Sequence, residues 1–224
     1  MTVEVGSSVK AVAFSSDNRL IVSGSEDKLV RMLDASTGET LKVLEGHTDN
    51  VRSVAFSSDD SRVISGSNDK SVRVWDALTG EMLKVLGGHT GYVWSVAFSS
   101  DDTRIVSGSQ DESVRVWDAS SGETLKVLEG HTDEVWSVAF SSDNRLIVSG
   151  SVDKSVRVWD ASTGETLKVL EGHTDSVWSV AFSSDDSRIV SGSDDKSVRV
   201  WDASTGETLK VLEGHTGYVR SVAF

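Results

Sequence analysis

Histidine, serine and aspartate recur along this chain in a pattern that could do chemistry, because these three side chains make up the triad of acyl-transfer enzymes. All five histidines occupy one slot, in Gly-His-Thr, at a spacing of 42 residues: His47, His89, His131, His173 and His215. A nucleophilic site is normally one constellation in one cleft, whereas this pattern repeats along the chain. The repetition favours a structural role, and we expect no catalytic residue and no enzyme activity.

Paired carboxylates are a second candidate, since neighbouring aspartates can share a proton or bind a cation. Three pairs occur, at Asp59-Asp60, Asp101-Asp102 and Asp185-Asp186. Each pair lies in a short polar stretch between two apolar runs, where aspartate favours turn geometry. We interpret the pairs as solvated turn residues, and we expect neither a metal site nor a cofactor.

The elements that carry these residues return at a fixed period. The segment GHTDNVRSVAF at 46–56 comes back with small changes at 88–98, 130–140, 172–182 and 214–224. A fixed period in the range of 20–50 residues indicates a repeat architecture. The sequence therefore predicts one domain over residues 1–224, or part of one, built of the units 4–45, 46–87, 88–129, 130–171, 172–213 and a partial unit 214–224.

Each unit contains four short apolar runs separated by polar turns. In the second unit the runs are Val51–Phe56, Arg62–Ser67, Ser71–Trp75 and Met82–Leu86. Runs of this length joined by short turns are typical of antiparallel strands, and no stretch has the spacing of a sustained helix. We predict an all-β chain of about five four-stranded antiparallel units plus one extra first strand at 214–224.

A Gly-His pair before the first run and a Trp-Asp pair closing the third, Trp75-Asp76, resemble the WD40 repeat, which forms one blade of a β-propeller. The Trp-Asp pair returns at Trp117-Asp118, Trp159-Asp160 and Trp201-Asp202, so that the resemblance covers residues 4–224. The first unit departs from the pattern and is degenerate. Val5 stands in place of the histidine and Leu33 in place of the tryptophan, although Asp34 is kept.

The resemblance implies a hydrogen-bonded chain of four side chains in each complete unit. In the family it joins the histidine before the first strand, a serine on the second, an aspartate in the next turn and the tryptophan of the third. Buried polar groups must satisfy one another, because an unpaired one costs about 1–3 kcal/mol. The sets implied here are His47, Ser65, Asp69, Trp75; His89, Ser107, Asp111, Trp117; His131, Ser149, Asp153, Trp159; and His173, Ser191, Asp195, Trp201.

Differences between the units gather at three slots, which resemble the positions around the central opening of WD40 propellers on the face that binds partners. One slot holds Lys, Arg or Trp, and we expect it to be solvent-accessible because a buried lone cation is costly. Tryptophans with tyrosine and arginine beside them have the composition of an interface hot spot; drift after duplication is the alternative. We name as the variable rim Arg52, Asn68, Tyr92, Trp94, Gln110, Glu134, Trp136, Val152, Trp178, Asp194, Tyr218 and Arg220.

Composition limits the partners. A net charge of −13 argues against a surface that neutralises phosphates, so no nucleic acid is expected. The absence of cysteine excludes thiol chemistry and disulfides. The first residues, MTVEVGSSVKAVAF, show neither a signal peptide nor a membrane span, which predicts a cytoplasmic protein by default and no membrane partner.

Ring closure leaves three alternatives open. Residues 214–224 could replace 4–14 against 20–45 in the same chain, bringing His215 to Ser23 and Asp27. The same exchange could join two chains into a homo-oligomer. The chain could also be a piece of a longer repeat array, natural or engineered.

Two kinds of function remain at this point. The first is a non-enzymatic scaffold of near-identical repeats that binds a protein or peptide through the variable rim. The second is a structural or sensor repeat module, or a designed or truncated propeller fragment. It would have no dedicated partner site and would assemble by strand or blade exchange.

Overall fold

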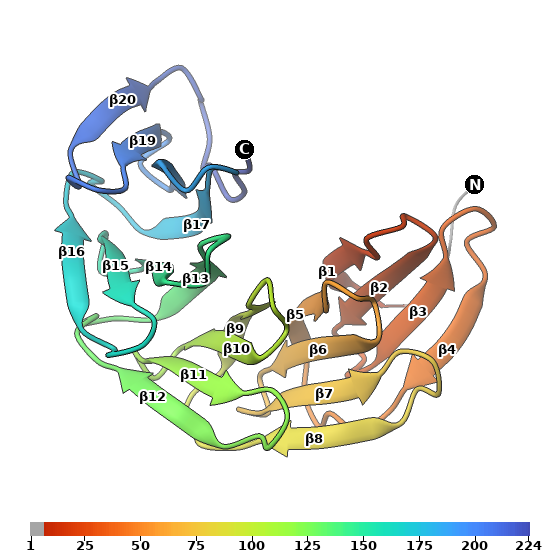
Figure 1. Ribbon diagram of the computed structural model, residues 1–224. Helices are drawn as coiled ribbons and strands as arrows, with labels where there is room; N and C mark the ends of the chain where they lie inside the picture. The colour runs from red at the N-terminus through yellow and green to blue at the C-terminus, as the bar shows by residue number, and fades with distance from the viewer. Residues whose placement is uncertain (1–6) are drawn as a thin grey trace. The chain divides into compact units, whose positions relative to one another are not determined.

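The computed structural model describes residues 7–224, which form strands and turns and no helix (Figure 1). Five four-stranded antiparallel sheets are present, and in each sheet the strands pair in chain order. The predicted all-β class of about five four-stranded units is therefore confirmed. The start of the unit 4–45, with Val5, lies outside the described residues.

The strands have nearly the same bounds in every sheet. The first sheet contains β1 (Val9–Phe14), β2 (Leu20–Ser25), β3 (Val30–Asp34) and β4 (Thr40–Leu44). The second contains β5 (Val51–Phe56), β6 (Arg62–Ser67), β7 (Val72–Asp76) and β8 (Met82–Leu86). The third contains β9 (Val93–Phe98), β10 (Arg104–Ser109), β11 (Val114–Asp118) and β12 (Thr124–Leu128). The fourth contains β13 (Val135–Phe140), β14 (Leu146–Ser151), β15 (Val156–Asp160) and β16 (Thr166–Leu170), and the fifth β17 (Val177–Phe182), β18 (Arg188–Ser193), β19 (Val198–Asp202) and β20 (Thr208–Leu212).

The described residues fall into two compact units. One contains the first two sheets and extends to Ser107, with Trp117–Thr124 added; the other is Gly108–Val116 with Leu125–Phe224. The single domain over residues 1–224 stays a prediction. Each unit has a core formed where neighbouring sheets pack face to face.

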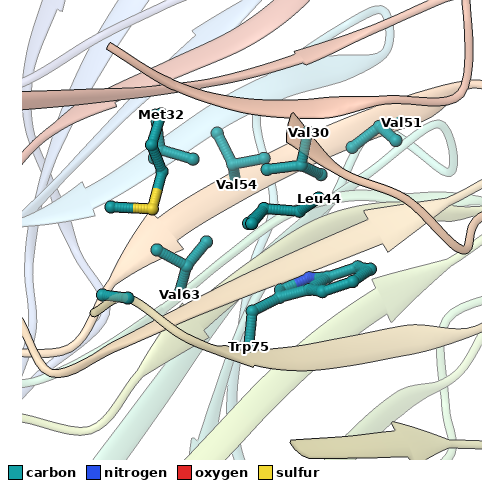
Figure 2. Packing of buried hydrophobic residues seen from close by; sticks show 9 residues of the cluster. Val30, Met32, Leu44, Val51, Val54, Val63 and Trp75 are labelled. Carbon is teal, nitrogen blue, oxygen red and sulfur yellow. The ribbon is translucent and has the colours of Figure 1, made fainter. Parts of the chain in front are cut away.

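One buried core of the first unit lies between the first and second sheets, and another lies between the second and third sheets. Val30, Met32 and Leu44 of the first sheet meet Val54 and Trp75 of the second, and all of these side chains are buried (Figure 2). In the second unit, side chains from β14, β15 and β16 make the corresponding contact with the fifth sheet around Trp201. The tryptophan of each Trp-Asp pair in these two cores therefore packs against the preceding sheet, which links neighbouring repeats.

Glycine on the second strand of a sheet lets the next sheet come close. A Cβ atom added at Gly66 would lie 2.7 Å from Val93 and 3.0 Å from Val96 of β9. The same close contact joins Gly150 to Val177 and Val180 in the second unit. Only a residue without a side chain permits this approach, which explains the constant Ser-Gly-Ser of every second strand.

The prediction of an extra strand at 214–224 is wrong for this structure. No ladder forms there, because a ladder needs a neighbouring strand and no described strand pairs with this segment. The segment nevertheless packs on the fifth sheet. Val219 N donates to the Ser193 carbonyl at 3.0 Å, and Val222 N donates to Ser179 Oγ at 3.2 Å.

The in-chain strand exchange stays a prediction. β1 pairs with β2 along Val9–Phe14 and occupies the edge that residues 214–224 would need.

Among residues 7–224, no helix has the length and apolar character required to cross a membrane.

Candidate functional site

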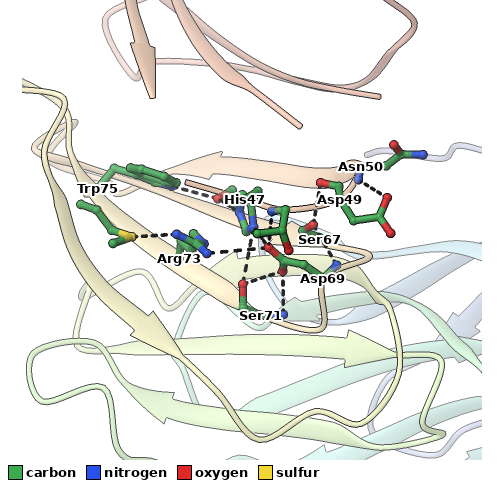
Figure 3. Close-up of polar contacts among 11 residues, drawn as sticks. His47, Asp49, Asn50, Ser67, Asp69, Ser71, Arg73 and Trp75 are labelled. Atoms are coloured by element: carbon green, nitrogen blue, oxygen red, sulfur yellow. Dashed lines mark hydrogen bonds and ion pairs between the residues drawn. The ribbon is translucent and has the colours of Figure 1, made fainter. Parts of the chain in front are cut away.

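A buried chain of hydrogen bonds joins two strands of the second sheet, and the turn between them, to the loop before the sheet (Figure 3). Trp75 Nε1 donates to Ser65 Oγ at 2.8 Å, and Ser65 Oγ lies 2.7 Å from His47 Nε2. His47 Nδ1 lies 2.8 Å from Asp69 Oδ2. A proton on Nδ1 completes the chain, since it leaves Nε2 to accept from the serine hydroxyl.

The loop before β5 is shaped by the residue preceding the histidine. Gly46 has φ +156°, and a Cβ atom there would lie 2.5 Å from Arg73 Nη1 and 3.3 Å from the Trp75 ring. Glycine is favoured before the histidine because its positive φ strains other residues, and because a side chain there would displace the end of Arg73 and crowd the Trp75 ring.

Burial sets the protonation states in this chain. It lowers the pKa of His47, and the hydrogen bond to Asp69 only partly offsets that effect. Burial also opposes ionisation of Asp69, but the hydrogen bonds from His47 and Ser71 outweigh it and hold the pKa of that carboxyl well below its usual range. A neutral imidazole therefore faces a carboxylate.

The same geometry recurs in the other complete repeats. His131 and His173 each lie 2.7 Å from their serine and 2.7 Å from their aspartate. Their tryptophans donate to the same serines at 2.8 Å. In the third sheet, Ser107 Oγ lies 2.7 Å from His89 Nε2 and accepts from Trp117 Nε1 at 2.8 Å.

The serine hydroxyls of these sets cannot act as nucleophiles in this arrangement. The four serines are completely buried, and each already accepts a hydrogen bond from an indole. A substrate carbonyl has no route to them. Among residues 7–224, no group of three or more His, Asp and Glu side chains is arranged to hold a metal ion.

The paired aspartates have a structural role that we did not predict. Asp59 closes its own turn by accepting from Ser57 Oγ at 2.7 Å and from Ser61 N at 2.9 Å. Asp60 instead accepts from Ser16 N at 2.8 Å, in the turn of the first sheet. The second aspartate of the pair is therefore more than a solvated turn residue, because it ties neighbouring sheets together.

Within the described residues, the first sheet lacks the chain of hydrogen bonds. Leu33 is buried in the place of the tryptophan, and Ser23 Oγ is buried without a partner among the described residues. Asp27 turns to Arg31, with Nη2 and Oδ2 2.6 Å apart, and also accepts from Ser25. The Arg31 hydrogen bond is the main reason that the pKa of Asp27 falls to about 2.

Rim residues of the first unit form one contact group. The Arg52 guanidinium lies 4.9 Å from the centre of the Trp94 ring, and its Nε donates to Asn68 Oδ1 at 2.9 Å. Tyr92 meets Trp94 edge to face, with ring centres 5.8 Å apart. Trp94 Nε1 is buried and has no hydrogen-bond partner among residues 7–224.

Rim residues of the second unit form a longer stack. The Trp136 and Trp178 rings lie 3.8 Å apart at 32°, and the Arg220 guanidinium lies 4.6 Å from the Trp178 ring centre. The two indoles donate to acidic rim residues, Trp136 to Glu134 at 3.0 Å and Trp178 to Asp194.

The remaining rim residues lie close to these groups. Gln110 Nε2 donates to Glu134 Oε1 at 3.2 Å, and Val152 is half-buried. Exposed Tyr218 lies beside Arg220, 5.7 Å from guanidinium to ring centre.

The three rim tryptophans are accessible to solvent only in part. Trp94, Trp136 and Trp178 are half-buried, because they stack on neighbouring rim residues. The structure also reveals pairing between slots 16 residues apart: Lys10 with Glu26 at 2.7 Å, Arg52 with Asn68, and Trp178 with Asp194. The constant spacing and the matched chemistry of these pairs were visible in the sequence and could have revealed them.

Comparison with known proteins places these features in a family. A family model described as "WDR90, 4th beta-propeller" matches residues 50–179, more than half of the chain, and one described as "WD domain, G-beta repeat" matches 3–34 and 164–202. The chain belongs to the WD40-repeat β-propeller family.

A curated relative matches over a short segment only. The probable serine/threonine-protein kinase PkwA of Thermomonospora curvata is 51% identical over 39 residues, which are 17% of this chain and 5% of that protein. The chain thus covers a very small part of this relative.

Proposed function

We propose that this chain is a non-enzymatic scaffold that binds a protein or a peptide through the variable rim. Membership of the WD40 family favours an interaction role, and the buried histidine sets take the structural role of holding each blade. The observation that carries the proposal is the stack of Trp136, Trp178 and Arg220.

A stacked aromatic pair suits binding because its side chains are ordered before the partner arrives. Ordering a flexible side chain on binding costs about 0.5–1.5 kcal/mol, and this cost is largely met in advance when rings stack and their N–H groups are bonded. Tryptophan, tyrosine and arginine are also the residues that most often dominate binding energies. The rim concentrates all three types at the positions where the repeats differ.

The charge of the chain favours a basic partner. The net charge is −13, and the carboxylates of Glu134 and Asp194 lie beside the indoles of the stack. Complementary charge speeds encounter and suppresses wrong partners. We therefore infer a peptide segment that carries lysine or arginine next to an apolar or aromatic anchor.

The test is selection of a displayed random-peptide library on the chain, followed by titration of the selected peptides. The Trp136→Ala/Trp178→Ala double variant should bind them at least about tenfold more weakly, a loss of about 1.4 kcal/mol. Leu78→Ala is the matched control, because Leu78 is an apolar residue 82% exposed and outside the rim. Far-UV circular dichroism checks that both variants are folded.

Two results would contradict this function. One is that the library yields no peptide that binds the wild-type chain. The other is that the double variant and Leu78→Ala bind the selected peptides equally well, since the stack would then contribute nothing.

A further inference from the structure

The edge strand of the second sheet differs in sequence from the edge strands of the other repeats. The segment 77–87, which contains β8 and the turn before it, reads ALTGEMLKVLG. It has Leu78 in place of serine, Met82 in place of threonine and Gly87 in place of glutamate. The other four segments at this place read ASTGETLKVLE, with one conservative change at Ser121: 35–45, 119–129, 161–171 and 203–213. One edge strand has therefore lost two hydroxyls and a carboxylate.

Leu78 gives up a hydrogen bond that the other four turns make. In those turns a serine donates from Oγ to the aspartate that ends the third strand, at 2.6–2.7 Å: Ser36, Ser120, Ser162 and Ser204. Leucine has no group that can donate this bond. The Leu78 side chain is 82% exposed, so it gains no packing in return. The fold itself therefore does not explain this leucine.

Gly87 is not required by the fold either. Its φ is not positive, and a Cβ atom added there would meet nothing within 4 Å. The glutamates at the same place in the other repeats are exposed: Glu45, Glu129, Glu171 and Glu213. A glycine that the fold does not need leaves room for another backbone to come close beside β8.

β8 presents an apolar face on an open edge. It is the last strand of the second sheet, and no described strand pairs with its outer side (Figure 1). Met82 lies opposite Trp75 and Val85 opposite Arg73, so both side chains lie on one face of the sheet, where they are 46% and 50% exposed. An end of the chain does not cause this exposure, because the second sheet packs against the first sheet in one core and against the third in another.

The charges on this edge indicate what kind of strand fits it. Residues 81–87 carry one charge of each sign, Glu81 and Lys84, whereas the same stretch of every other repeat carries two glutamates and one lysine. Opposite charges across two strands stabilise their pairing, and like charges weaken it. A second copy of the chain fits less well, because a two-fold axis through the middle of β8 would place Lys84 opposite Lys84.

We propose that β8 is a docking edge on which an extended segment of another protein adds as a fifth strand of the second sheet. The segment carries an acidic residue opposite Lys84, a basic residue opposite Glu81 and apolar residues opposite Met82 and Val85. Main-chain hydrogen bonds to an open edge supply affinity in this mode of binding, and alternate side chains supply specificity. None of these residues belongs to the variable rim, so the inference does not depend on the proposed function.

A displayed random-peptide library tests the edge against a matched variant. The edge variant, Leu78→Ser/Met82→Thr/Gly87→Glu, gives the second repeat the sequence of 161–171, which already forms β16. It should therefore fold, which far-UV circular dichroism checks. Selection on the wild-type chain with excess soluble edge variant present removes peptides that bind elsewhere. The selected peptides should bind the wild type at least about tenfold more tightly than the edge variant. A selection that yields no such peptide overturns the inference.

Moving the three residues to another repeat tests whether they define the site. Ser162→Leu/Thr166→Met/Glu171→Gly, added to the edge variant, gives the fourth sheet the edge that the second sheet has lost. This chain should bind the selected peptides again. If binding is not restored, the three positions do not make a docking edge and the inference is overturned.

Hydrogen exchange tests the pairing of strands. Binding of a selected peptide to the wild-type chain should slow exchange of the β8 backbone amides at least about tenfold, because an added strand protects the open edge. The β16 amides serve as the control and should not change. Unchanged exchange in β8 would overturn the addition of a strand.

Two measurements separate this surface from other contacts. In light scattering, the wild-type chain and the edge variant should have the same mass at every concentration. A multimer of the wild type that the edge variant does not form would make the occupant a second copy and overturn the proposal. Trp136→Ala/Trp178→Ala should bind the selected peptides as the wild type does. Weaker binding would place the peptides on the rim, so failure of the docking edge can be told apart from failure of the rim.

Discussion

The first and second sheets have the same strands and nearly the same sequence, yet the serine and the aspartate of each sheet have different hydrogen-bond partners. In the second sheet, His47 connects Ser65 to Asp69. In the first, Asp27 pairs with Arg31, and the Ser23 hydroxyl has no partner within the part of the chain that the structure describes.

The difference shows that the aspartate can find another partner when the histidine is missing, whereas the serine cannot. A carboxylate at the edge of a sheet can pair with an arginine of its own strand pair, because a guanidinium is long and always charged. A hydroxyl between two strands can be reached only from the loop before the first strand or from the third strand. Losing the histidine and the tryptophan together therefore leaves the serine alone.

Removing the tryptophan from the second sheet should have the largest effect. Trp75→Ala deletes the side chain that fills the core between the two sheets and also the donor to Ser65. We expect a loss of about 4 kcal/mol in the free energy of unfolding, measured by urea titration. Leu33→Ala in the first sheet should cost clearly less, about 2 kcal/mol. Equal losses would mean that the two sheets do not differ in this respect.

Removing the histidine should have the next largest effect. His47→Ala leaves Ser65 and Asp69 each without one buried partner, which should cost about 2 kcal/mol in urea titrations. Leu78→Ala, at an exposed turn position, should change the free energy of unfolding by less than about 0.5 kcal/mol. If the two variants unfold at the same urea concentration, the set does not stabilise the blade.

Giving Ser23 an indole N–H donor should make the first sheet more stable and more like the second sheet. Leu33→Trp places an indole N–H where Trp75 has one, and the partly open face around Ile21 leaves room for the ring. We expect a gain of about 1 kcal/mol in thermal and urea unfolding. Leu33→Phe adds apolar surface without a donor and should gain less. The idea fails if the phenylalanine variant is equally stable.

Mild acid should weaken the second and fifth sheets and leave the first sheet unchanged. Burial lowers the pKa of His47 and His173 below the usual 6.5, so the unfolded chain binds protons first as pH falls below that value. Stability should therefore be constant above about pH 6.5 and fall below it. Hydrogen exchange at pH 7.5 and 5.5 should give a smaller free energy of opening for β6 and β18 at the lower pH. The decrease should be less than the effect of His47→Ala. An equal free energy of opening at both pH values would contradict the neutral, buried histidines.

The stability from the aspartates should disappear at lower pH. The pKa of Asp69 is lowered in the folded state from its usual 3.8, so its contribution is complete above about pH 4 and is lost as pH falls further. Asp27, with a pKa of about 2, behaves in the same direction because Arg31 holds its charge. Acid unfolding of wild type and Asp27→Asn should separate the two contributions. Identical acid midpoints would mean that the Arg31 pair adds no stability.

Much of the fold could be predicted because its signals are local and repeated. The 42-residue period, the turn residues and the Trp-Asp pair place all four strands of a repeat within about one residue. The hydrogen-bonded sets could be named only through the family resemblance, since His47 and Ser65 are 18 residues apart and nothing local links them.

Features that depend on neighbouring repeats could not be predicted. Asp60 looks like any turn residue until the turn of the adjacent sheet is seen 2.8 Å away at Ser16 N. The rim tryptophans look exposed because their slot also accepts arginine, and only the structure shows that one ring covers the next. Residues 214–224 have the sequence of a strand, but a ladder needs a partner that a single segment does not supply.

The close fit of glycine on valine between sheets has a consequence for how such a chain can change in length. The contact of Gly66 with Val93 and Val96 is the same as that of Gly150 with Val177 and Val180. A recombination event that adds or removes one whole period in register would create no junction that is not already present elsewhere. Copy number can therefore drift without a folding penalty at the seam, and any limit on it must come from closure or from the partner rather than from the blades themselves.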